Sequence, residues 1–382
     1  MTARVRVDLM TRFLSDNIRC YIMFPGSGYR YYTSMKETGF VFLDVPGFPF
    51  KQDEDIGDAD DLVARVVVSE RIRQWYREGA GEDALPPRTV SELSNFKETS
   101  ARRQLAGLVR NFVKRVKVND LFVVPPKHYT DDVLFGEIEE DDVHLVDHPE
   151  ISGEKVPAKK VRWIKRIERR RVPGWLERKI ASPNPLRQIE REWFQSLFDI
   201  VYERYVYDGV YACKFSVSAH DFSSVDNYRL QRLFLFSSGA FALPRDSLQS
   251  LPFSEIVDRA AETEDMPDQR IAISSPGHMV LYKKSLVPIV AAALISTALI
   301  SGAGDSIAQT PTVEIVNSAD DSEAADLCNV DVAAEVNGEL QAMGFTKWQE
   351  LCMIAARSRI RAGVDTRMPT SIEGGDAVRE EE

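Results

Sequence analysis

Aromatic side chains gather early in the sequence, around a glycine-rich stretch at residues 25–28. An aromatic ring can stack on the flat face of any nucleic-acid base, and such a contact contributes roughly 1–3 kcal/mol per base. The same pattern also suits rings that fill the interior of a small barrel, so both interpretations stay open. The candidate ligand-binding residues are Tyr29, Tyr31, Tyr32, Phe40, Phe42 and Trp163.

A second candidate site is a basic run at residues 155–191, which follows an acidic run at residues 131–150. A row of cations predicts contacts with nucleic-acid phosphates, and each phosphate neutralised steepens the salt dependence of binding. Alternatively, the two runs neutralise each other within the fold. The candidate nucleic-acid-binding residues are Lys159, Lys160, Arg162, Lys165, Arg166, Arg169, Arg170 and Arg171.

The sequence contains no recognisable catalytic or metal-binding motif. It lacks a Walker loop, a dinucleotide-binding glycine motif and a nucleophile elbow, and its four cysteines form no CxxC pair. His144 and His148 are four residues apart, but they lie in an acidic segment that does not read as a helix, so the spacing is no metal signature. We therefore expect no cofactor and no enzyme activity, although a degenerate nuclease remains open.

The elements that must position the aromatic residues read mainly as strands. Turn residues separate the apolar runs of the first part, and the spacing becomes helical at 60–77 and 90–113 before strands resume. Gly136 within one run predicts a bulge or a close backbone approach. The predicted strands are 20–24, 29–35, 40–45, 121–126, 133–140 and 161–172.

This order of elements resembles the PUA/EVE-like domains that are joined to prokaryotic restriction and anti-phage defence proteins. The segments that carry the resemblance are 118–126, Phe135-Gly136-Glu137-Ile138, 161–167 and 176–180. The resemblance implies a barrel-like sheet whose concave face receives a modified base or a nucleotide. Related defence proteins often continue with a nuclease domain, but the paired acidic residues and lysine that would hold its metal ion are missing here.

We predict an α+β protein in several parts. Residues 1–187 form the PUA/EVE-like β-barrel domain, which binds a ligand or nucleic acid, and residues 190–283 form a second α+β domain with strands at 210–219 and 232–243. An apolar helix at 284–304 precedes a helical C-terminal region at 305–362, split at Gly344, and a disordered tail at 363–382.

Residues 286–302 carry no charge at all. Their number is at the lower limit for a transmembrane helix, which needs roughly 17–25 residues. The many small residues suit helix packing in a bilayer, and they equally suit a helix buried in a soluble domain. Insertion would place the N-terminal half in the cytoplasm, because Lys283 and Lys284 precede the segment. We therefore expect either a cytoplasmic protein or an inner-membrane protein with a cytoplasmic N-terminal half.

Together these features favour a non-enzymatic sensor or effector of antiviral defence. The N-terminal domain would bind a modified base, a nucleotide or a nucleic acid, and the rest would act by oligomerisation or at the membrane. Expected partners are the ligand, further copies of the chain, a membrane and a protein of the same defence system. The alternative is a soluble DNA-binding accessory subunit with the apolar helix in its core. The net charge of −11 argues against indiscriminate coating of nucleic acid.

Overall fold

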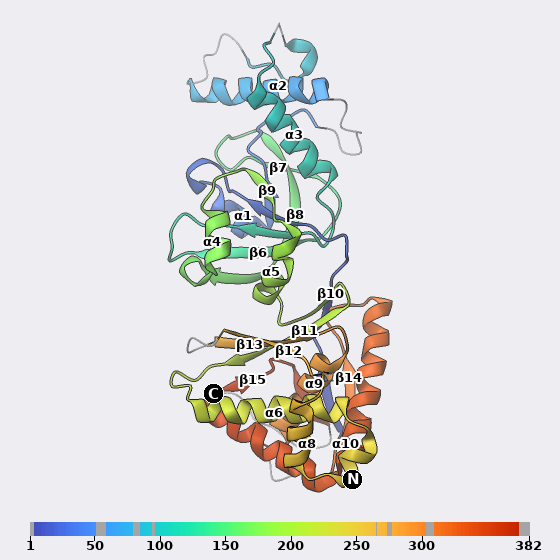
Figure 1. Cartoon of the computed structure of the whole chain (residues 1–382). Coiled ribbons are helices and arrows are strands. Elements are labelled where there is room, and N and C mark those ends of the chain that lie inside the picture. The colour runs from blue at the N-terminus through green and yellow to red at the C-terminus, as the bar shows by residue number, and fades with distance from the viewer. Residues whose placement is uncertain are drawn as a thin grey trace. The chain divides into compact units, whose positions relative to one another are not determined.

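The computed structural model describes residues 4–50, 59–78, 85–93, 96–264, 266–272, 277–302 and 309–373. Within these ranges the chain is a mixed α+β structure with three sheets, one of them a curled half-barrel, and a long C-terminal helix (Figure 1). The predicted α+β class is therefore confirmed. The chain divides into an inserted unit, Asn17–Phe194, and a split unit that combines Met1–Asp16 with Gln195–Glu382.

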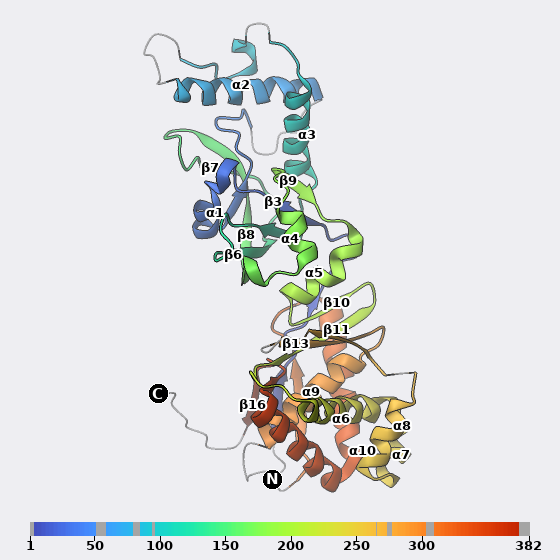
Figure 2. The same cartoon turned by 60° about the vertical axis from the view of Figure 1, so that its left-hand side comes forward.

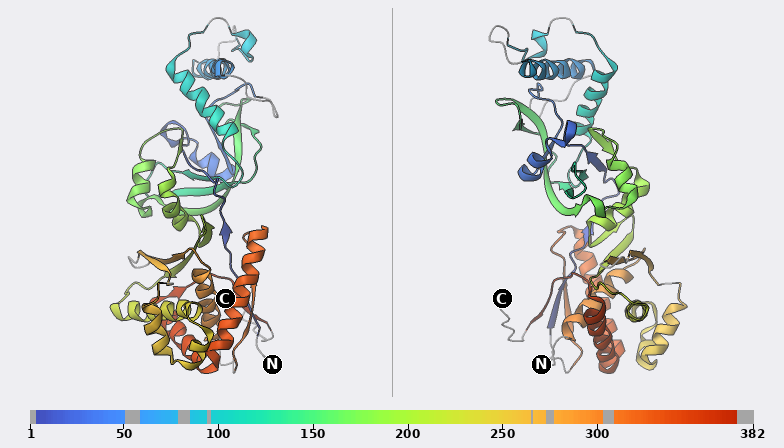
Figure 3. Two further views of the ribbon diagram at one scale, coloured as in Figure 1. Left: turned by 45° about the vertical axis from the view of Figure 1, so that its right-hand side comes forward. Right: turned by 90° about the vertical axis from the view of Figure 1, so that its left-hand side faces the viewer.

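The split unit joins both ends of the sequence in one sheet. Strand β1 (Arg4–Asp8) lies between β14 (Thr312–Val316), to which it is parallel, and β16 (Thr370–Glu373), to which it is antiparallel (Figure 3). The alternation that the strand period requires is visible in β1, where Val5 and Val7 are buried and Arg4 and Arg6 are exposed. Residues 1–16 were predicted to belong to the N-terminal domain; this long-range pairing groups them with the C-terminal part of the chain.

The inserted unit is built around a curled sheet with the strand order β4-β8-β6-β5-β3-β9, and β7 also pairs with β8. Strand β8 is 14 residues long, and it pairs with β4 and β7 through its first half and with β6 through its second half (Figure 2). Strand β8 thus connects the part of the sheet that contains β4 and β7 with the part that contains β6. The strands are β3 (Cys20–Met23), β4 (Phe40–Phe42), β5 (Leu121–Val124), β6 (Asp132–Ile138), β7 (His144–Asp147), β8 (Lys155–Glu168) and β9 (Leu186–Gln188).

Gly136 sits at an irregularity in the pairing of β6 with β8. The register between the two strands shifts between Phe135 and Gly136. A Cβ atom at Gly136 would lie 2.7 Å from the ring of Trp163 and 2.9 Å from the carbonyl oxygen of Arg162. Both the bulge and the close backbone approach predicted from this glycine are confirmed.

The helices of the inserted unit correct two predictions. Residues 29–35, predicted as a strand, lead into helix α1 (Tyr32–Thr38), because the buried Tyr31 and Met35 are four residues apart and Gly39 ends the helix with a positive φ of 69°. The helix predicted over 90–113 begins only at Ser100, where the Thr99 side chain caps the backbone N–H of Arg102. The helices are α1, α2 (Ala59–Arg77), α3 (Ser100–Lys114) and α4 (Gly174–Ile180).

A second sheet and a group of helices form the rest of the split unit. The strand order is β12-β13-β11-β10-β2, with β15 pairing β11. Helices α6, α9 and α10 pack against one another. The strands are β2 (Arg12–Phe13), β10 (Arg204–Tyr207), β11 (Val210–Val217), β12 (Asp268–Ala272), β13 (Gly277–Lys283) and β15 (Val364–Asp365); the helices are α5 (Phe194–Val201), which begins at the unit boundary, α6 (Ser224–Ala242), α7 (Arg245–Ser250), α8 (Phe253–Ala261), α9 (Val287–Ser301) and α10 (Glu323–Ala362).

The strand predicted at 232–243 is wrong, because these residues lie in α6 and its end. This helix begins at a capping box formed by Ser223 and Asp226. It is buried against α8, α9 and α10, so apolar residues occupy several of its faces and the helical period is lost from the sequence. The split predicted within the C-terminal helical region is confirmed: Gly344 interrupts α10 with a φ of 67°.

The apolar segment is a core helix. Every residue of α9 from Val287 to Leu299 is buried, and the helix packs on α6 and α10. No helix in the described ranges is both long and apolar enough to cross a membrane. The transmembrane prediction for 284–304 is therefore wrong, and the buried-helix alternative fits. The predicted disordered tail at 363–382 is also wrong for its first part, since β15 and β16 pair with β11 and β1; its remainder lies outside the described residues.

Candidate ligand-binding pocket

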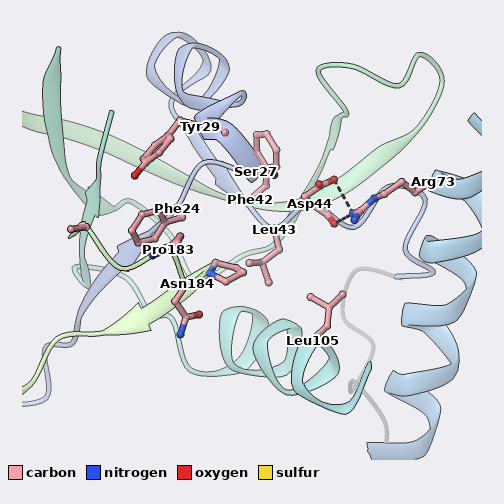
Figure 4. A pocket seen from close by; sticks show the side chains of 14 residues that line it. Phe24, Ser27, Tyr29, Phe42, Leu43, Asp44, Arg73, Leu105, Pro183 and Asn184 are labelled. Carbon is pink, nitrogen blue, oxygen red and sulfur yellow. Dashed lines mark hydrogen bonds and ion pairs between the residues drawn. The ribbon is translucent and has the colours of Figure 1, made fainter. Parts of the chain in front are cut away.

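The inserted unit contains a pocket of about 630 Å³. Its walls come from the glycine-rich loop after β3, from the chain that leaves β4, from α2 and α3, and from the proline-rich loop before β9 (Figure 4). A volume of this size is in the range that proteins use for small molecules, roughly 300–1,000 Å³. The lining residues are Phe24, Gly26, Ser27, Gly28, Tyr29, Phe42, Leu43, Asp44, Arg73, Leu105, Ala181, Pro183, Asn184 and Pro185.

The glycine-rich loop holds Tyr29 in an unusual backbone conformation. Gly26, Gly28 and Tyr29 all have positive φ, and the value for Tyr29 is 64°. Glycine is needed at position 26, because a Cβ atom there would lie 2.4 Å from the ring of Tyr31. A tyrosine in this conformation costs on the order of 1–3 kcal/mol, and strain of this kind concentrates at binding sites. The loop therefore presents the Tyr29 ring at the pocket wall under local strain.

Apolar side chains form the floor of the pocket, and polar ones lie at its edges. Phe24, Phe42 and Leu43 are buried, and the rings of Phe24 and Tyr29 are 5.9 Å apart between centroids. The rim segment of residues 183–185 is exposed, and Phe24 donates its backbone N–H to the Pro185 carbonyl over 3.1 Å. Asn184 stands in this segment, so an amide that can both donate and accept hydrogen bonds lines an aromatic pocket.

Asp44 anchors the opposite end of the pocket through two arginines. Arg30 Nη2 lies 2.7 Å from Asp44 Oδ2, and Arg73 Nη2 lies 2.9 Å from Asp44 Oδ1. Arg73 also donates to the backbone carbonyl of Asp44. Burial alone would raise the pKa of Asp44, but the hydrogen bond from His148 and the charges of both arginines outweigh it and lower the pKa to about 2.

His148 contacts Asp44 and holds its position. Its Nδ1 accepts the backbone N–H groups of Glu150 and Ile151 over 3.1 and 3.0 Å, so that nitrogen carries no proton. The ring proton is therefore on Nε2, which lies 3.3 Å from Asp44 Oδ1 and 3.2 Å from the hydroxyl of Tyr31. Burial raises the pKa of Tyr31 above its usual value, so the hydroxyl stays a hydrogen-bonding group.

A second, smaller cavity of about 230 Å³ adjoins this ion cluster. Asp44 and Arg73 line both cavities. The other walls of the small cavity come from α2, from the loop before α1 and from the chain after β7. Its lining residues are Arg30, Tyr31, Asp44, Arg73, Tyr76, Arg77, Glu150 and Ile151.

The structure brings two of the six predicted ligand-binding aromatics, Tyr29 and Phe42, to the main pocket, while Tyr31 lines the small cavity. The other three lie elsewhere: the Tyr32 hydroxyl donates to the Asp132 carbonyl over 2.5 Å, Phe40 contacts His144 edge-on, and Trp163 packs against the core of the unit.

Two of the eight predicted nucleic-acid-binding residues are buried. Lys159 is fully buried and donates to the Asp141 carbonyl, and burial lowers its pKa to about 8. Arg169 is buried too, where it binds both carboxylate oxygens of Glu177 and lies 4.7 Å above the ring of Tyr129. Both cations are thus used to hold the fold.

Four of the other basic residues pair with acidic neighbours. Their pairs are Lys160 with Glu139, Arg162 with the buried Glu137, and both Arg170 and Arg171 with Glu168. Arg166 is exposed, and Lys165 is half-buried. Only the pairs of Lys160 and Arg162 join the basic run to the acidic run of residues 131–150, as the alternative interpretation expects, because Glu168 belongs to the basic run itself. Phosphate binding by the basic run stays a prediction.

Sequence reasoning missed the polar end of the site. Asp44, Arg73 and His148 come from three separate segments, and nothing in their local spacing links them. The two loops of the main pocket did leave a signal, because residues 25–28 and 182–185 are rich in glycine and proline. That signal reads as a turn and a boundary, and only the fold brings the two loops to one cavity.

Comparison of the chain with protein-family models, with curated proteins and with solved structures finds no match in any of the three. Within the described residues, no group of three or more histidine, cysteine, aspartate and glutamate side chains is placed to hold a metal ion. The geometry of the candidate site combines an aromatic floor, an amide at the rim and an ionised cluster at the far end.

Proposed function

We propose that the inserted unit is a PUA/EVE-like binding module that takes a flat heterocycle, the base of a nucleotide or of a nucleic acid, into the main pocket. The single observation that carries this proposal is the pocket itself, which combines about 630 Å³ of space with three aromatic walls, Phe24, Tyr29 and Phe42. A curled half-barrel sheet in the same unit supports the proposal.

The chemistry of the lining fits a base better than a purely apolar ligand. A base offers two π-faces for aromatic contacts and an edge of donors and acceptors. Tyr29 supplies a half-buried ring, and the Asn184 amide can read an edge by donating and accepting at once. None of the predicted nucleic-acid-binding residues of the basic run lines the main pocket. Recognition of a base in this pocket therefore does not require the basic run.

In this proposal the protein is a sensor of a defence system and performs no catalysis in the inserted unit. The ligand is a modified base, a nucleotide or the base of a nucleic-acid chain. Occupancy of the pocket acts through the glycine-rich loop, because Tyr29 has the backbone strain that a bound ring would compensate.

The test is a titration of the full chain with ordinary and methylated deoxynucleosides. Binding is measured by the change in tryptophan fluorescence or by calorimetry. Tyr29→Ala removes one stacking surface and is expected to weaken binding by about 5- to 150-fold, the equivalent of roughly 1–3 kcal/mol. Asn184→Ala is expected to change the preference among bases more than the overall affinity, because it removes an edge contact.

Tyr228→Ala is the matched control, since Tyr228 is an exposed tyrosine of the split unit. It should bind every deoxynucleoside as the unaltered chain does. Binding that is unchanged in both Tyr29→Ala and Asn184→Ala, or absent from the unaltered chain for every deoxynucleoside and its 5′-monophosphate, would refute the proposed function.

A further inference from the structure

The small cavity and the main pocket share a wall made by Asp44 and Arg73. We propose that the small cavity is a phosphate subsite, so that the inserted unit takes a phosphorylated nucleotide and not a free base. This inference rests on the proposed function of the main pocket. In a nucleotide the sugar separates base and phosphate by a short distance, and two adjoining cavities give each part its own place.

The small cavity carries an excess of positive charge. Three guanidinium groups line it, from Arg30, Arg73 and Arg77, against the carboxylates of Asp44 and Glu150. Asp44 is held by Arg30 and Arg73, and Glu150 lies 3.1 Å from Arg30. Arg77 is exposed and lines the small cavity, and its side chain makes no ion pair or hydrogen bond within the described part of the chain. Its charge therefore faces the cavity.

Arg73 uses only part of its hydrogen-bonding capacity within the described residues. Its Nη2 binds Asp44, while its buried Nε has no hydrogen-bond partner among the described residues. An unpaired buried donor costs about 1–3 kcal/mol, and a guanidinium binds phosphate best through two parallel N–H bonds. A phosphate that draws Arg73 toward the small cavity would give this guanidinium the partners it lacks.

The other groups that face the cavity leave the excess charge in place. The Tyr76 hydroxyl is directed to the Ser152 carbonyl and to Glu154, and Glu154 is also paired with Arg88. The Tyr31 hydroxyl is held by His148. Arg73 and Arg77 both come from α2. A phosphate monoester has enough oxygens to bind both guanidinium groups at once, whereas a single carboxylate has only two.

The experiment compares each deoxynucleoside with its own 5′-monophosphate on the full chain. The monophosphate is expected to bind at least about tenfold more tightly, with a difference that shrinks as salt rises. Arg77→Gln should remove most of that difference and leave deoxynucleoside affinity unchanged, because Arg77 does not line the main pocket. Arg71→Gln is the matched control: Arg71 is exposed on the same helix and lines neither cavity, so the difference should persist.

The outcomes separate the two proposals. If deoxynucleosides bind and their monophosphates bind no better, or if Arg77→Gln and Arg71→Gln behave alike, the phosphate subsite is refuted while the proposed function stands. If neither form binds, both are refuted. A difference that disappears only in Arg77→Gln supports the subsite.

Discussion

Charged side chains in the interior of this protein fall into two kinds. Asp44, Lys159 and Arg169 are each held by hydrogen bonds or ion pairs. Glu339 on α10 differs from them, because it is buried and one of its carboxylate oxygens has no hydrogen-bond partner among the described residues. An uncompensated buried carboxylate is unfavourable when ionised, so Glu339 should make stability depend on pH.

Glu339→Gln should stabilise the split unit near neutral pH. Burial, helped by the charge of Glu335, raises the pKa of Glu339 to about 8 from the ordinary 4.5. Protonation therefore favours the folded state, and the free energy of unfolding falls as pH rises from 4.5 towards 8. At pH 7 the cost is roughly 3 kcal/mol, at about 1.4 kcal/mol per unit of pKa difference. Thermal unfolding at pH 5 and pH 8 measures it.

The control for this prediction is Glu335→Gln. Glu335 is more exposed and pairs with Arg245 over 3.4 Å, so its loss should change stability by less than about 1 kcal/mol. The Glu339→Gln variant should lose the decline between pH 5 and pH 8 that the unaltered chain shows, whereas Glu335→Gln should keep most of it, because burial is the larger cause of the raised pKa. An equal decline in all three proteins would show that another group is responsible.

At the residue scale the sequence could predict which aromatic residues are candidates for a binding site, but not which side chains each of them contacts. Tyr29 and Phe42 were found because aromatic residues alternate with turn residues near them. Trp163 is a candidate of the same residue type within a predicted strand, yet it packs against the core. The difference between a lining ring and a core ring depends on tertiary contacts, and a one-dimensional pattern does not contain them.

At the scale of elements, segments with a clear period or a strong cap signal were predictable. Strands β5, β6 and β8 follow apolar runs between turn signals, and the structure contains them. Elements buried on several sides were not predictable in the same way: α6 resembled a strand and α9 resembled a membrane span. A helix that is covered all round loses the polar face that would reveal its period.

Gly136→Ala should destabilise the inserted unit by about 1–3 kcal/mol, the usual cost of overpacking. The added methyl group would lie 2.4 Å from Val161 Cγ1 and 2.9 Å from the backbone carbonyl of Arg162, so the bulge between β6 and β8 would have to open. Denaturant unfolding of the full chain measures the loss as a shift of the transition to lower denaturant concentration.

Gly107→Ala is the matched control and should act in the opposite direction. Gly107 lies within α3, and a Cβ atom there would meet nothing within 4 Å. Replacing a helical glycine by alanine without steric cost stabilises by roughly 0.5–1 kcal/mol. If Gly136→Ala were as harmless as Gly107→Ala, the close approach of β6 and β8 would be disproved.

At the scale of the whole molecule, the chain is one unit inserted into another. The ends of the inserted unit meet in its sheet, because β3 pairs with β9 through Tyr21 and Gln188. Each unit also has a hydrophobic core of its own. Residues 17–194 should therefore fold as an isolated fragment, with a cooperative thermal transition and the deoxynucleoside affinity of the full chain.

Residues 195–382 should not fold without residues 1–16. The shorter fragment lacks β1, the central strand between β14 and β16. It also lacks the Leu9 carbonyl, one of three backbone acceptors that hold the buried guanidinium of Arg204. Leaving one buried donor of this cation without its acceptor costs about 1–3 kcal/mol, which adds to the loss of β1 and is a substantial part of the stability of a typical domain.

Fusing residues 1–16 to Gln195 through a short glycine–serine linker should restore a cooperative transition. Circular dichroism and amide proton dispersion in NMR spectra distinguish the fused chain from residues 195–382 alone. The control is the same fusion with Val5 and Val7 replaced by aspartate. It keeps the chain length and the Leu9 carbonyl but cannot bury β1, so it should stay unfolded. If residues 195–382 folded as stably as the fusion, the N-terminal strand would be dispensable and the division into an inserted and a split unit would not govern folding.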